Sequence, residues 1–78
     1  MKKKVKDLIL GDTFRVEGDW YEVSGELHFA PAEMEGNPHP GGTAMVPAWP
    51  FSGGRVVAKI VGQEMLLMLD AETEVRTR

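Results

Sequence analysis

The feature that most constrains the fold is the stretch 13–24, TFRVEGDWYEVS, whose pattern predicts two short β-strands joined by a tight turn. Glycine comes first in Gly18-Asp19, as a two-residue type II′ turn requires, because that position needs a positive φ. Side chains alternate between the two faces of a strand, so Phe14, Val16, Tyr21 and Val23 should share the core face. The full predicted pairing is Glu17 with Trp20, Val16 with Tyr21, Arg15 with Glu22, Phe14 with Val23 and Thr13 with Ser24.

Length and composition predict a single small domain over residues 1–78. Hydrophobic residues make up 42% of the chain and charged residues 27%, which is an ordinary globular balance. The chain has no cysteine, so neither a disulfide framework nor a thiolate metal site can form. No apolar run approaches the roughly 20 residues that cross a bilayer, and no signal peptide is evident. We therefore expect a cytoplasmic protein with no membrane association.

The charge distribution argues against nucleic acid as a partner. The formal net charge is −3, and four of the nine basic residues lie within residues 1–6. The rest of the chain carries the other five basic residues against all twelve acidic ones. Phosphate binding needs clustered positive charge, so we expect the acidic body to bind nucleic acid poorly. The lysine-rich start is typical of a solvated, frayed terminus.

Residues 30–54 have a different composition from the rest of the chain. All five prolines and five of the nine glycines lie there, which predicts one long loop with at most a short strand over 43–46. Loops of this length are usually functional or disordered. The loop holds Met34, His39, Met45, Trp49 and Phe51. Trp49 and Phe51 are either recognition anchors on a stiff proline scaffold or side chains that cover the open end of a barrel.

Residues 55–70 predict a second hairpin around a Gly62-Gln63 turn. This turn would pair Ile60 with Met65, Ala58 with Leu67, Val56 with Leu69 and Arg55 with Asp70. Both faces of such a hairpin are apolar, so the second face needs a cover, which is either the proline loop or another copy of the chain. The residues that we expect in such self-association are Val57, Leu66 and Met68.

The remaining segments complete the expected sheet. Residues 5–12 predict an extended or single-turn lead-in, and the strand after Gly18-Asp19 is expected to continue, with a bend at Gly25, to Phe29. Leu27 and Phe29 would then point inward. Residues 73–77 predict a closing edge strand with Val75 inward, protected from further pairing by its arginines.

About five short strands with almost no helix predict an all-β fold, a small and partly open barrel with one long Pro/Gly-rich loop over 30–54. The run DLILGDTFRVEGDWYEV resembles the opening of SH3-like barrels, and most of all the N-terminal KOW-like domain of translation elongation factor P. In that family the next loop carries a modified basic residue that acts at the ribosome. The corresponding stretch here, residues 39–43, has no lysine or arginine, so that role does not carry over. The overall pattern also resembles small proteins of bacteriophages and prophages.

The polar residues indicate no catalytic or metal site. His28 and His39 with Glu33 and Glu35 match no metal-ligand spacing, so we expect no metal and no cofactor. The acidic residues that include Glu17, Asp19 and Glu22 are typical of a solvated face. No nucleophile elbow, phosphate loop or dinucleotide motif occurs, so we expect no enzyme.

These patterns favour a small non-enzymatic accessory protein of phage or prophage type, located in the host cytoplasm if phage-encoded. It would engage a protein partner through the 30–54 loop and the acidic face. The alternative is a translation- or RNA-associated barrel that uses the lysine-rich start and the loop aromatics. The residues proposed for partner binding are Met34, His39, Met45, Trp49, Phe51, Glu17, Asp19 and Glu22.

Overall fold

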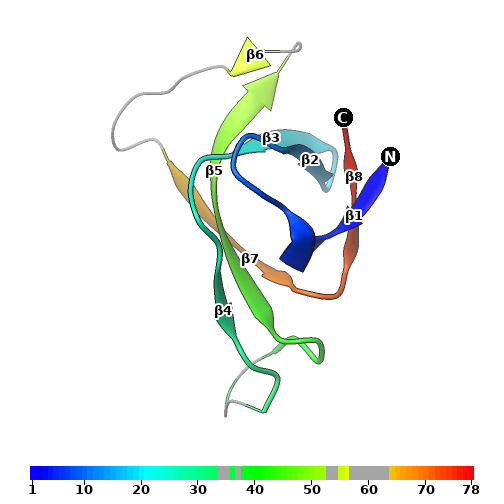
Figure 1. The fold of residues 1–78 in the computed structure, drawn as a ribbon, viewed down its shortest axis with the longest axis vertical. Helices are drawn as coiled ribbons and strands as arrows, with labels where there is room; N and C mark the ends of the chain where they lie inside the picture. The colour runs from blue at the N-terminus through cyan, green and yellow to red at the C-terminus, as the bar shows by residue number, and fades with distance from the viewer. Residues whose placement is uncertain (34–35, 37, 53–54, 57–63) are drawn as a thin grey trace.

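A computed structural model describes residues 1–33, 36, 38–52, 55–56 and 64–78 of the chain. These residues form one curled, open β-sheet and a single 3-10 turn, η1 (Val5–Asp7) (Figure 1). The strands are β1 (Lys2–Lys4), β2 (Thr13–Val16), β3 (Asp19–Val23), β4 (His28–Ala30), β5 (Thr43–Ser52), β6 (Arg55–Val56), β7 (Met65–Asp70) and β8 (Glu74–Thr77). Their order is β1-β8-β2-β3-β5-β4, with β6 and β7 also paired to β5. The all-β, partly open character is confirmed, although the sheet has more strands than the five predicted.

The hairpin of β2 and β3 forms, but the predicted turn and register are wrong. Its central residues are Glu17 and Gly18, with φ of 51° and 90°, which is what a type I′ turn requires. Phe14 therefore pairs with Tyr21, and Arg15 with Trp20 rather than with Glu22. Each β2 residue meets a partner two positions earlier than predicted. A shift of two positions keeps every side chain on its expected face.

The core lies on the concave face of the curled sheet. Phe14 and Val23 are buried there as predicted, and Val16 and Tyr21 pack partly against them. The rings of Phe14 and Tyr21 have centroids 5.8 Å apart. The other buried apolar side chains come from η1 and the residue after it, from β5, from the β7–β8 turn and from β8: Val5, Leu8, Ala44, Val46, Ala48, Ala71 and Val75.

Strand β5 corrects the prediction of one long loop over 30–54. It is ten residues long and pairs with β3, β4, β6 and β7. Its two prolines are tolerated because backbone N–H groups point alternately to either side of a strand. The Pro47 carbonyl accepts a hydrogen bond from the Ser24 N–H at 2.9 Å, so the Pro47 nitrogen faces the bend at Gly25, between β3 and β4. The Pro50 nitrogen faces the other side, past the last described pair with β7, Ala48 with Met65.

Strand β7 pairs with β5, whereas the second predicted hairpin required it to pair with residues 55–60. Leu69 lies opposite Ala44 rather than Val56, and Asp70 opposite Thr43 rather than Arg55. The predicted Gly62-Gln63 turn and the predicted partners at 58 and 60 lie outside the described residues. The prediction failed because β5 was not recognised as a strand, and it provides β7 with six paired positions.

The predicted division of β7 into two faces is largely confirmed. Leu67 and Leu69 pack against the core. Leu66 and Met68 are 55% and 60% exposed, so the described part of the 30–54 segment leaves more than half of each side chain uncovered. Met65, expected inward, is exposed at the start of the strand.

The ends of the chain lie together in the sheet (Figure 1). The lysine-rich start is not a frayed terminus, because β1 pairs with β8. Strand β8 is therefore enclosed between β1 and β2 and is not the expected edge, although Val75 is buried as predicted. The single turn η1 and the half-buried position of Leu27 agree with expectation, whereas Phe29 is 54% exposed. In the described part of the chain, no helix is long and apolar enough to cross a membrane.

Candidate functional surfaces

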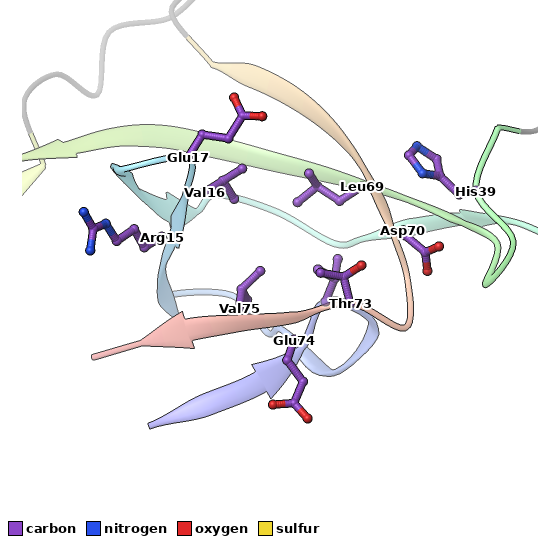
Figure 2. A pocket seen from close by; sticks show the side chains of 10 residues that line it. Arg15, Val16, Glu17, His39, Leu69, Asp70, Thr73, Glu74 and Val75 are labelled. Carbon is purple, nitrogen blue, oxygen red and sulfur yellow. The ribbon is translucent and has the colours of Figure 1, made fainter.

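A hollow of about 360 Å³ lies on the concave side, between β7 and the β2–β8 pair (Figure 2). Its floor is apolar, and Val16, Leu69 and Val75 point toward one another across it. The other lining residues are Val5, Arg15, Glu17, His39, Asp70, Thr73 and Glu74. The hollow is thus the seam at which this curled sheet does not close.

Three of the charged groups around the hollow have a structural role or point away from its centre. Asp70 accepts hydrogen bonds from the backbone N–H groups of Gly41 at 3.2 Å and Glu72 at 2.9 Å, which ties the start of β5 to the β7–β8 turn. The charged ends of Arg15 and Glu74 point away from the centre (Figure 2). The described residues contain no cluster of three or more potential metal ligands.

The convex face carries a patch that we call the outer stripe: Met45, Pro47 and Trp49 of β5 with Leu66 and Met68 of β7. Directly paired residues share a face of the sheet, and Met45 lies opposite Met68 while Pro47 lies opposite Leu66. The β5 members are half-buried, and the β7 members are more than half exposed. Met45 and Trp49, predicted for partner binding, and Leu66 and Met68, predicted for self-association, therefore lie in one apolar surface.

The other predicted site residues are dispersed. Glu17 and Asp19 are exposed at the tip of the β2–β3 hairpin, whereas Glu22 is half-buried opposite Trp49, so the predicted acidic face is divided. His39 lines the concave hollow. His28 is exposed on β4, opposite Met45. Met34, Glu35 and Val57 lie outside the described residues.

A second feature of the convex face was missed by the sequence reasoning. Lys2 of β1 lies opposite Arg76 of β8, and Arg76 lies opposite Arg15 of β2. We call these three residues the cation row. The same line continues to Trp20 of β3 and then to Phe51 of β5. All three cations are exposed. They come from three distant parts of the sequence, so no local run of charged residues predicts the row.

The other lysines near the start are paired with acidic side chains. Lys3 binds Asp12 at 2.8 Å, while Lys4 and Lys6 bind the two oxygens of Glu72 at 3.0 and 2.8 Å. Burial acts to raise the pKa of Asp12, but hydrogen bonds from Lys3 and the Ile9 N–H outweigh it and leave that pKa below its usual value. Hydrogen bonds from Lys6 and Lys4 lower the pKa of Glu72, and Glu72 raises the pKa of Lys6. The positive charges of these lysines are therefore largely compensated.

No family model matches this chain, and neither does any curated protein or solved structure. The outer stripe and the cation row, both on the convex face, are therefore the candidate functional surfaces.

Proposed function

We propose that this domain is a small, non-enzymatic protein-binding module whose partner protein docks on the outer stripe. The observation that carries the proposal is the exposure of Leu66 and Met68 directly beside Met45 and Pro47 on the neighbouring strand. Contiguous exposed apolar patches on small soluble domains commonly mark interaction sites. Methionine and tryptophan are also enriched in the cores of protein interfaces.

The backbone beneath the outer stripe supports the same proposal. Strand β5 is paired on both sides along this region, with β3 and β4 on one side and β7 on the other. Pro47 adds a fixed φ at the centre of the stripe. Side chains held on such a scaffold lose little conformational entropy when a partner binds, which favours affinity.

The test uses Leu66→Glu and Met68→Glu, with Ile9→Glu as the matched control. All three residues are exposed and apolar, and Ile9 is 63% exposed in the segment before β2, outside the stripe. Surface changes of this kind should alter the free energy of unfolding by no more than about 0.5 kcal/mol. A buried charge at the interface should weaken partner binding at least tenfold, or by about 1.4 kcal/mol.

Sedimentation velocity shows whether the partner is a second copy of the chain. Capture of proteins from the source lysate, followed by binding curves with the captured protein, covers the case of a different partner. We expect the two stripe variants to lose the complex and Ile9→Glu to keep it. The proposal is wrong if the wild type stays monomeric and all three variants capture the same proteins as wild type.

A further inference from the structure

The cation row is an unusual arrangement for a β-sheet. Lys2, Arg76 and Arg15 stand directly opposite one another across three adjacent strands. Neighbouring strands lie about 4.8 Å apart, so the backbones of three cationic residues follow one another at about that spacing. Like charges in directly opposed positions destabilise a sheet. A small domain gains nothing in its own stability from this row.

Acidic partners distinguish the neighbouring lysines from the cation row in the described part of the chain. Within the described ranges, no ion pair involves Lys2, Arg15 or Arg76, whereas Lys3, Lys4 and Lys6 are each paired. The nearest acidic side chains in the register are Glu74, which lies opposite Lys4, and Glu22, which lies opposite Thr13. The positive charge of the row is therefore available to an external anion.

Two aromatic rings extend the same line. Trp20 lies opposite Arg15, and Phe51 lies opposite Trp20. Both rings are partly exposed. The Arg78 guanidinium lies over the Phe51 ring, 5.4 Å from its centroid, which adds a fourth cation beside the aromatic end. A line of single positive charges that ends in flat aromatic groups is thus built from β1, β8, β2, β3 and β5.

We propose that this part of the convex face binds single-stranded nucleic acid. The phosphates of successive nucleotides would lie along Lys2, Arg76 and Arg15, and a base would stack on Trp20 or Phe51. Proteins that bind single strands combine these two elements, a positive track and aromatic platforms. A carboxylate-rich protein would use the cations but would leave the rings without a matching group. The proposal goes beyond the protein-binding role of the outer stripe and uses a different side of the convex face.

The first experiment measures fluorescence anisotropy of a labelled oligothymidylate of about 12 nucleotides, a length within single-strand site sizes. Binding is followed between about 50 and 200 mM salt. Each phosphate contact on a single strand contributes about −0.7 to the slope of log affinity against log salt, so three contacts give about −2. Arg76→Gln should weaken binding several-fold and make the slope shallower by about 0.7.

The matched control is Lys6→Gln, which removes the same charge from η1, where Lys6 is already paired with Glu72. This variant should leave both the affinity and the slope within error of wild type. Trp20→Leu keeps apolar bulk but removes the stacking surface, so it should weaken binding about tenfold with an unchanged slope. If Trp20→Leu lowers the unfolding midpoint, Phe51→Leu serves in its place.

Three outcomes would overturn the proposal. One is the absence of binding at the lowest salt. Another is an equal loss for Lys6→Gln and Arg76→Gln, which would mean that only net charge matters. The last is stronger competition by an oligoglutamate peptide than by unlabelled oligothymidylate, which would assign the cation row to an acidic protein.

Discussion

The two faces of β5 share one backbone, but their side chains differ in size and in burial. On the concave face, Ala44, Val46 and Ala48 are small and buried. On the convex face, Met45, Trp49 and Phe51 are larger and only partly buried. These three side chains belong to the same core cluster as Phe14 and Val23. Residue size is therefore a poor guide to burial here, and the largest apolar groups of β5 are not those that hold the monomer together.

The largest loss of stability in this comparison is expected for Phe14→Ala, on the concave face. Phe14 is completely buried, so its truncation should cost about 3–5 kcal/mol of unfolding free energy. Small domains have about 5–15 kcal/mol in total, so the variant should be largely unfolded near physiological temperature. Urea titration followed by circular dichroism measures the loss. Met68→Ala, on the exposed side of β7, is the control and should change stability by less than about 0.5 kcal/mol.

A smaller loss of stability is expected for a substitution in the β2–β3 turn. Gly18 has a φ of 90°, and a β-branched side chain is strained there, so Gly18→Val should cost about 1–2 kcal/mol. Glu17, with a φ of 51°, provides the opposite control, because asparagine adopts that conformation more readily. Glu17→Asn should therefore raise the thermal midpoint slightly. A Gly18→Val protein as stable as wild type would contradict the type I′ turn.

An effect of similar size is expected for Trp49→Ala, on the convex face. Trp49 is half-buried against its neighbours on the sheet, so its loss should cost about 1–2 kcal/mol, less than the loss of Phe14. Thermal unfolding of the two variants side by side makes the comparison direct. If Trp49→Ala is as damaging as Phe14→Ala, Trp49 belongs to the core and the outer stripe loses its aromatic member.

Alternation in the sequence was enough to predict which residues of β2 and β3 face the core. The exact pairing was not predictable, because both Glu17-Gly18 and Gly18-Asp19 offer a glycine to a two-residue turn. Strand β5 was missed because proline and glycine lower strand propensity on average, while a strand needs its N–H groups only where a partner lies. Among the described residues, no ladder partner lies opposite the nitrogens of Pro47 and Pro50.

The candidate surfaces were harder to predict from the sequence than the fold, because they depend on pairing between distant strands. Met45, Trp49, Leu66 and Met68 were each singled out from the sequence, but only the pairing of β5 with β7 places them on one face. The cation row is the extreme case, since residues 2, 15 and 76 become neighbours only through β8. A sequence pattern with a period of two residues contains no information about such distant partners.

The pairing of β1 with β8 also has a consequence for the order in which the chain folds. It joins residues 2–4 to residues 74–76, so almost the entire polypeptide must be closed into a loop before this ladder forms. Loop closure of that length costs entropy before any contact compensates for it, and domains rich in such contacts fold in milliseconds to seconds rather than microseconds. We expect β1 to dock late, after the β2–β3 hairpin and β5 have assembled. A polyanion that requires Lys2 and Arg76 together would then bind only the completed fold, and would stabilise it by mass action.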